Sequence, residues 1–300
     1  MEHWRPLLIA VAGLVAATLG RDAGAQRELV ARAVSEARRL GNEDALVHLA
    51  EEIGAVGIDQ CLGHASRAGR LICAQSARYL EHPWPVLAVL ATVLRDHDRQ
   101  VASRAAESMV IILSSLDPGD LGPEEPDPSA TEELLQGLRG LAGDRDLSSD
   151  IVAQVVTAAS ALARAAGAGR DVARDSLAHP EVAVRRAGVA ALAGSDETED
   201  VAALAALVER ESDLLTRALA VAETCEATAA RGREMPEAVV EQASVLLDDR
   251  RVRPSTVGPL LACLARASTP QVRPLREQAA RHPNAGARAA WAALVSDGER

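Results

Sequence analysis

Apolar and small side chains recur at helical spacing in residues 179–192, and this pattern returns in weaker copies along most of the chain. In this stretch Val182 and Val189 lie on one apolar face of the expected helix. Pro180 precedes the first helical turn, where the N–H that proline lacks has no partner in any case. Glu181 places a negative charge near the helix N-terminus, which the helix dipole favours. The stretch therefore predicts a helix that follows Pro180.

The copies can be aligned on the position that Arg185 occupies in residues 179–192, and we call this position the repeat anchor. Copies of the pattern give the anchor positions 104, 154, 185, 217, 255 and 288. Successive anchors lie 31, 32, 38 and 33 residues apart, and 50 residues separate the first two. A second helical segment lies between anchors, as at residues 198–211, 236–247 and 271–281. A two-helix unit with this period is typical of an α-solenoid, in which each helix pair stacks on the next.

Each copy has Pro or Asp near its start, then Val-x-Arg, and then Ala and Leu. This order of residue types resembles HEAT repeats, including the variants called PBS-lyase HEAT-like. The resemblance is strongest at residues 179–192 and 282–294, moderate at 98–113 and 211–223, and weak before residue 97. It implies an all-α fold, a right-handed α-solenoid of about seven antiparallel helix pairs. It also implies a partner bound on a concave face lined by the second helices, since repeat proteins of this kind serve mainly in binding.

The arginines at the repeat anchors could be mistaken for a functional row of basic side chains. The resemblance to HEAT repeats implies a structural role for them instead. In that pattern the arginine satisfies acidic groups or carbonyls at the turn of the next repeat, a role that suits its fixed fork of donors. The structural repeat arginines are Arg104, Arg185, Arg217 and Arg288.

Residues 1–25 have the layout of a secretory signal peptide. An apolar run from Leu7 to Gly20 follows Arg5, and a small-x-small triplet ends at Ala25. The run is shorter than the roughly 20 residues that a helix needs to span a bilayer. We therefore expect cleavage near Ala25 and a periplasmic or secreted protein. The alternatives are an uncleaved anchor, which would be the sole membrane contact, and an apolar first helix of the folded domain.

Proline and acidic residues interrupt the pattern at residues 117–133, which divides residues 26–116, helical repeats with an N-terminal cap, from HEAT-like repeats at 134–300. Four prolines and several carboxylates favour an exposed loop there. An acidic docking loop or a weak Ca²⁺ site is the functional interpretation, but the prolines interrupt the ordered oxygen ligands that Ca²⁺ requires. We expect a mobile insertion between repeats.

Four cysteines in an exported protein are compatible with two disulfides. Cys61 and Cys73 lie on consecutive predicted helices joined at Ala68-Gly69, and Cys225 and Cys263 each lie eight residues after an anchor. Stacked helices have axes about 8–10 Å apart, whereas the Cα atoms of a disulfide lie within about 7 Å. The second bond therefore requires both side chains to point into the shared interface. Buried free thiols are the alternative.

Metal and cofactor chemistry receive little support from the sequence. Cys61-x-x-His64 with Cys73 offers three ligands but no second compact pair, and His179 and His282 each precede a proline at a helix start, which is a turn feature. We expect no metal, no cofactor and no catalytic residues, because the adjacent carboxylate pairs would diverge on a helix and no nucleophile motif is present.

The net charge and the composition of the chain indicate which classes of partner it is suited to bind. The formal net charge is −11, all 32 basic residues are arginine, and aromatic residues make up 1% of the chain. An acidic chain with few aromatics is a poor candidate for binding nucleic acid. The leading hypothesis is a non-catalytic protein–protein interaction scaffold of the cell envelope. The alternative is a lyase-like or enzyme accessory protein that binds a small molecule between repeats.

Overall fold

The computed structural model describes residues 23–64, 66–121 and 126–298. The predicted signal peptide lies outside these residues, apart from Ala23–Ala25, which form the start of the first described helix. The described residues are helices and connecting turns, without a strand. The all-α solenoid fold that the repeats predict is therefore confirmed. The chain divides into two compact units at Gly169, and each is described by itself.

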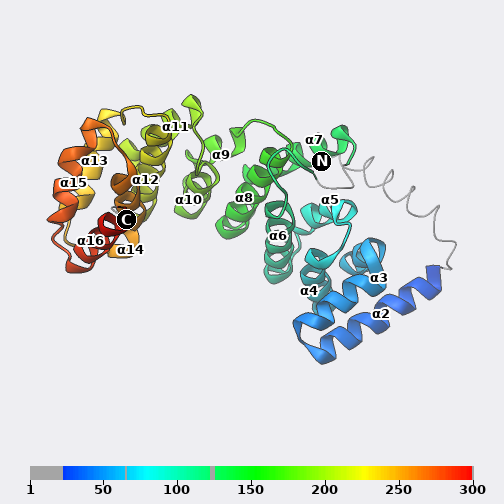
Figure 1. Cartoon of the computed structure of the whole chain (residues 1–300). Helices are drawn as coiled ribbons and strands as arrows, with labels where there is room; N and C mark the ends of the chain where they lie inside the picture. The colour runs from blue at the N-terminus through cyan, green and yellow to red at the C-terminus, as the bar shows by residue number, and fades with distance from the viewer. Residues whose placement is uncertain (1–22, 65, 122–125, 299–300) are drawn as a thin grey trace. The chain divides into compact units, whose positions relative to one another are not determined.

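The described residues of the first unit form seven α-helices (Figure 1). Their bounds are α2 Ala23–Leu40, α3 Glu43–His64, α4 Arg67–Ser76, α5 Trp84–Val93, α6 Arg99–Ser114, α7 Pro128–Ala142 and α8 Ser149–Ala165, with a 3₁₀ turn at Ala77–Tyr79. Helices α2, α4, α6 and α8 pack side by side in one layer, and α3, α5 and α7 form the other layer.

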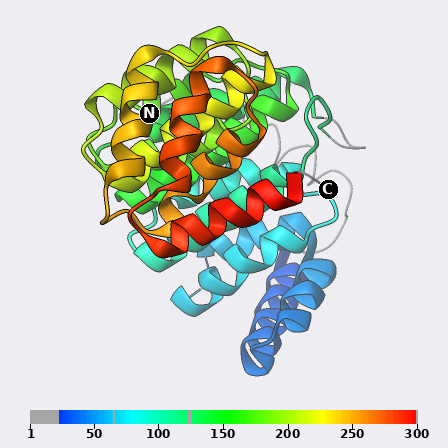
Figure 2. The same ribbon diagram turned by 60° about the vertical axis from the view of Figure 1, so that its left-hand side comes forward.

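The second unit repeats this arrangement (Figure 2). Its helices are α9 Asp171–Ser176, α10 Val182–Ala191, α11 Thr198–Arg210, α12 Leu214–Ala230, α13 Glu237–Asp248, α14 Pro254–Arg266, α15 Arg273–Ala280 and α16 Ala285–Gly298, with a 3₁₀ turn at Pro270–Val272. Helices α10, α12, α14 and α16 form a layer that we call the anchor layer of this unit, because the repeat anchors lie on them. Helices α11, α13 and α15 form the opposite layer.

Most odd-numbered helices pack more extensively on the even-numbered helix that follows than on the one before. The repeat unit is therefore an opposite-layer helix followed by an anchor helix, which corrects the order inferred from the sequence. The reason is that the periodic pattern is clearest on the anchor helices. The repeat period alone does not determine whether the helix that pairs with an anchor helix comes before it or after it in the chain.

Two helices, α4 and α7, begin at residues other than those predicted from the sequence, because side chains cap their N-termini. Ser66 accepts a hydrogen bond from Gly69 N–H at 3.3 Å and caps α4, so Ala68 and Gly69 lie inside that helix, not in a turn before it. Asp127 accepts from Ser129 N–H at 2.9 Å and Pro128 opens α7, so the predicted loop at residues 117–133 ends earlier, at Asp127. Both starts follow the rule that a side-chain oxygen satisfies the first free N–H groups of a helix.

The core consists of thin layers of leucine, valine and alanine between neighbouring helices, as the composition requires. Leu204, Val221, Leu246 and Leu260 are each 0% exposed in the second unit. Trp291 of α16 is buried to 8% exposure and belongs to the same core. Because each layer is thin, most of a helix's stabilising contacts come from the adjacent helices of the stack.

Candidate functional site

Arg185 of α10 joins two successive repeats. Its Nε and Nη2 donate to the carboxylate of Glu211 at 2.6 and 2.8 Å, and its Nη1 donates to the carbonyl oxygens of His179 and Pro180 at 2.9 and 2.6 Å. The side chain of Glu211 is 0% exposed and that of Arg185 is 14% exposed. The guanidinium holds the pKa of Glu211 below its ordinary value, chiefly through these hydrogen bonds. The pair is therefore a buried, charge-assisted link between α10 and the turn before α12.

The other predicted repeat arginines differ from Arg185. Arg288 donates to the carbonyls of His282 and Pro283 in its own turn, at 2.6 and 3.2 Å. Arg104 is half-exposed and pairs with Glu107 of the same helix. The Nε of Arg217 is buried without a hydrogen-bond partner among the described residues.

In the first unit one link between repeats comes from α4. Arg70 donates to Asp96, in the turn before α6, at 2.9 Å. The sequence anchor thus marks a structural position whose contacts vary from one repeat to the next.

The residue six positions before the anchor makes a recurring contact that the sequence did not reveal. Its side chain accepts a hydrogen bond from the backbone N–H two residues later, at five of the six anchors. These residues are Asp98, His179, Glu211, Asp249 and His282, at distances between 2.8 and 3.1 Å. A carboxylate and an imidazole nitrogen both serve as the acceptor. The contact orders the turn that leads into each anchor helix.

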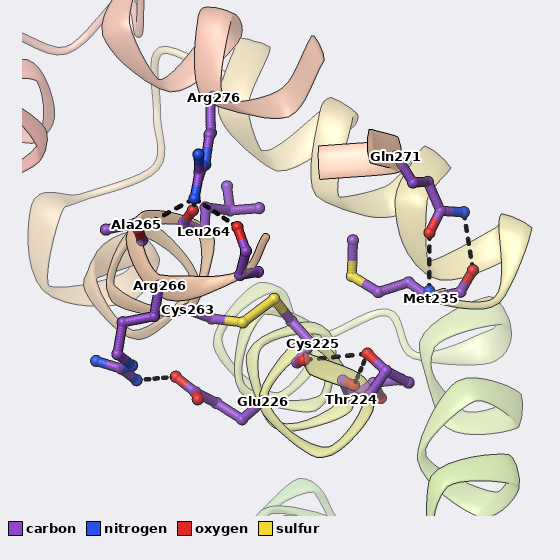
Figure 3. Close-up of a disulfide and its surroundings, with 12 residues drawn as sticks. Thr224, Cys225, Glu226, Met235, Cys263, Leu264, Ala265, Arg266, Gln271 and Arg276 are labelled. Atoms are coloured by element: carbon purple, nitrogen blue, oxygen red, sulfur yellow. Dashed lines mark hydrogen bonds and ion pairs between the residues drawn. A yellow bond between two sulfur atoms is a disulfide. The ribbon is translucent and has the colours of Figure 1, made fainter. Parts of the chain in front are cut away.

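Both cysteine pairs are joined in the structure. Cys61 of α3 bonds Cys73 of α4 with a Cα–Cα distance of 6.3 Å, and Cys225 of α12 bonds Cys263 of α14 with 6.2 Å (Figure 3). The second distance is shorter than typical helix spacing because both side chains point into the buried interface between neighbouring anchor helices. Cysteines in these bonds are not metal ligands or nucleophiles.

Polar contacts surround the second disulfide (Figure 3). Arg266 of α14 pairs with Glu226 of α12 beside it. Arg276 of α15 donates to the carbonyls of Leu264 and Ala265 at 2.7 and 3.1 Å, and so satisfies acceptors that the C-terminus of α14 leaves free. The disulfide therefore lies where α12, α14 and α15 meet.

The anchor layer of the second unit presents a solvent-facing stripe with small and apolar side chains. On α14 the stripe follows helical spacing through Ser255, Pro259, Ala262 and Arg266, none of which is buried. The α12 stripe consists of Leu215, Leu219, Glu223 and Glu226, all half-buried. We call these eight residues the α12–α14 surface.

Glu223 is the unusual carboxyl group of this surface. Burial raises its pKa, the N–H of Gly194 donates to it at 3.4 Å and lowers the pKa, and the neighbouring Glu226 raises it. No arginine pairs with it among the contacts of the described residues. A partly buried carboxyl that has no cationic partner of its own is a favourable partner for a basic group from another molecule.

A cavity of about 640 Å³ lies in the first unit, between α2, the end of α3 and the start of α4. Its lining includes Arg27 and Arg38 of α2, with Val30 and Val34 between them, and Gln60 of α3. Sequence reasoning missed this site. Its signal was the spacing of residues 27, 31, 34 and 38, which places them on one face of α2.

Within the described ranges, no group of three or more His, Cys, Asp or Glu side chains is arranged to hold a metal ion. The same part of the chain has no helix that is both long and apolar enough to cross a bilayer. The side chain of His64, considered above as a ligand, lies outside the described residues.

Comparisons with known proteins give a likeness of fold. No protein-family model matches the chain, and no curated protein matches it. The X-ray structure of YibA from Escherichia coli aligns with this chain over 93% of this chain and 99% of the YibA chain. The TM-score is 0.56 and the sequence identity is 13%. The crystal structure of an engineered protein matches 98% of this chain and 78% of its own, with a TM-score of 0.53 and 15% identity.

A designed armadillo repeat protein matches 69% of this chain and 98% of its own, with a TM-score of 0.43 and 17% identity. At such low identities, likeness to solved structures speaks for the fold and not for a shared activity. The two structures with TM-scores above 0.5 therefore show a likeness of fold alone, and the function of this chain has to be inferred from its own residues.

Proposed function

We propose that this protein is a non-catalytic scaffold of the cell envelope that binds a protein partner on the α12–α14 surface. The observation that carries the proposal is the composition of that surface. Small and apolar side chains of α12 and α14 lie next to a partly buried carboxyl that lacks a cationic partner, Glu223. Helical-repeat folds bind partners along continuous helix surfaces, which supports this assignment by analogy of fold.

The chemistry of the surface favours a basic segment as the partner. The chain carries a formal net charge of −11, which attracts basic proteins and raises their rate of encounter. A lysine or arginine from the partner would pair with Glu223 and offset the cost of ionising a half-buried carboxyl. Leu215 and Leu219 offer apolar contact beside it.

Photo-crosslinking tests this surface directly. A photoreactive amino acid at position 262, on the α12–α14 surface, should yield a crosslinked partner when the full chain is expressed in its own cell. The matched control places the same amino acid at Val245, which is 49% exposed on the opposite layer. Ala262→Arg should abolish the adduct formed from a second reporter position at Pro259, while Val245→Arg should leave it unchanged. Equal adducts from positions 262 and 245 would refute the assignment.

Export is the second part of the proposal. Two buried disulfides form and persist in an oxidising compartment, which supports a periplasmic or secreted location together with the signal-like segment at residues 1–25. Cell fractionation followed by N-terminal sequencing tests it. We expect mature protein in the envelope or medium with an N-terminus near residue 26. Protein in the cytosol that still begins at Met1 would exclude export.

The alternative function, binding of a small molecule between repeats, is favoured by a different observation. The cavity beside α2 has a volume within the range of about 300–1,000 Å³ that is usual for ligand sites. It lies in the first unit, so it is independent of the α12–α14 surface in the second unit.

A further inference from the structure

The cavity in the first unit differs from the rest of the chain in its charge. Its lining contains two arginines, Arg27 and Arg38, and no aspartate or glutamate, although the chain carries 43 acidic and 32 basic residues. Neither arginine forms an ion pair or hydrogen bond with a described residue. Both side chains line the cavity, so their charges are not offset by a carboxylate within its lining. The site therefore has a local positive potential that an anion would neutralise.

The two arginines are arranged along one face of α2. They are eleven residues apart, which places their Cα atoms about 16 Å apart at a rise of about 1.5 Å per residue. Val30 and Val34 lie between them and supply apolar contact. A ligand that fits this arrangement has an apolar body and an acidic group at one or both ends, since each guanidinium presents a fork of donors that matches a carboxylate.

One more polar group defines the ligand. The Oε1 atom of Gln60, at the end of α3, is buried and has no hydrogen-bond partner among the described residues. A buried acceptor without a donor costs free energy, and a donor supplied by a ligand removes that cost. Ser66, the cap of α4, lines the same cavity. The site thus combines two cations, an apolar strip and one acceptor that lacks a donor.

We infer that this cavity binds a small amphipathic organic anion that carries an N–H or O–H donor, such as an N-acylated acidic amino acid. The inference rests on the second candidate function, the binding of a small molecule between repeats, and is independent of the protein partner proposed for the second unit. In it, Arg27 and Arg38 bind the acidic groups, Val30 and Val34 contact the apolar body, and Gln60 accepts from the donor.

Fluorescence titration of the full chain with N-dansyl-L-glutamate tests the site. The probe has carboxylates at one end, an apolar ring system at the other and a sulfonamide N–H between them, so it represents the ligand class with its acidic groups at one end. We expect saturable binding that weakens when the salt concentration rises from 50 to 300 mM, because exposed charges are screened. Dansylamide, which lacks the carboxylates, should bind at least tenfold more weakly.

Matched variants on the same helix separate the site from general attraction to a basic helix. Arg27→Ala with Arg38→Ala should weaken probe binding at least tenfold. The control, Arg32→Ala with Arg39→Ala, removes the same charge from residues of α2 that do not line the cavity and should leave the dissociation constant within twofold.

All four arginines are exposed, so circular dichroism should show both double variants to be folded. Equal weakening by the two double variants, binding of dansylamide as tight as that of the glutamate, or no binding of either probe would overturn the inference. None of these results would bear on the crosslinking experiment, whose reporter positions lie in the other unit.

Discussion

His282 accepts a hydrogen bond from the backbone N–H of Asn284 through the Nδ1 atom of its imidazole, at 3.0 Å. Because a backbone N–H can only donate, Nδ1 carries no proton and the ring is neutral in the folded chain. The residue is 0% exposed, and burial lowers the pKa of its imidazole, with a further lowering from the nearby Arg288. Asp248 and Asp249 oppose this shift.

The stability of the second unit should therefore fall as the pH falls below about 6.5. The unfolded chain protonates His282 near the ordinary pKa of about 6.5, whereas the folded chain resists protonation until lower pH. The unfolded state then binds more protons, so the free energy of unfolding decreases between pH 7 and pH 5. His282→Asn keeps an acceptor at this position but does not titrate, so its melting temperature should change less over the same range.

The control for that experiment is His48→Asn, since the side chain of His48 is 85% exposed on α3. This variant should keep the pH dependence of the unaltered protein. Thermal unfolding of the three proteins at pH 7 and pH 5, followed by circular dichroism, measures the effect. Identical pH dependence in the His282 variant and the unaltered protein would show that this ring does not couple folding to protonation.

Arg185→Met should destabilise the protein by about 3–5 kcal/mol, because it leaves the buried carboxylate of Glu211 without its partner. Arg104→Met alters the same repeat position, but its pair with Glu107 is exposed, so a change within about 1 kcal/mol is expected. Chemical denaturation of both variants provides the comparison. If the two variants lose the same stability, the pair between α10 and the turn before α12 is not the link we describe.

Loss of the two disulfides should have unequal effects. The Cys225–Cys263 bond closes 38 residues and the Cys61–Cys73 bond closes 12. Loop-closure entropy then gives losses of about 4 and about 3 kcal/mol when each pair is replaced by alanine. Denaturation of the two double variants measures the losses, and mass spectrometry after alkylation without reductant tests the bonds themselves. Alkylation of four thiols in the unreduced native protein would contradict both bonds.

Gly188→Ala should cost about 1–3 kcal/mol, as overpacked cores do. A Cβ atom there would lie 2.1 Å from Ser176 Oγ and 2.9 Å from the carbonyl oxygen of Ala173, where α9 crosses α10. Gly258→Ala on α14 meets no atom within 4 Å and should stabilise the protein by about 0.5–1 kcal/mol, because alanine favours helix. Thermal unfolding should therefore shift in opposite directions for the two variants, and a shift in the same direction would contradict this view of the α9–α10 contact.

Local chemistry could be predicted well from the sequence, whereas contacts between repeats could not. The helix that follows Pro180 and the one that follows Pro283 were visible because capping and periodicity act over a few residues. The partner of Arg185 was predicted only as acidic groups or carbonyls at the turn of the next repeat. Arg217 and Arg104 occupy the same position without an acidic partner in that turn. Which acid lies within reach depends on how two helices pack, which no local pattern encodes.

The candidate ligand site illustrates the same limit. Arg27 and Arg38 share a helix face in any helical interpretation of residues 23–40. The role that we propose for them depends on the cavity beside α2, which Gln60 also lines. A spacing on one helix cannot reveal what the neighbouring helix leaves empty.

The sequence by itself determined an all-α repeat fold, since helical periodicity, proline position and alanine content act within single helices and recur about every 33 residues. The tertiary structure decided which helix completes each hairpin, that Cys225 approaches Cys263 to 6.2 Å, and where the cavity lies. These features depend on distances between helices, and those distances are set by how side chains from distant positions fill the shared interface.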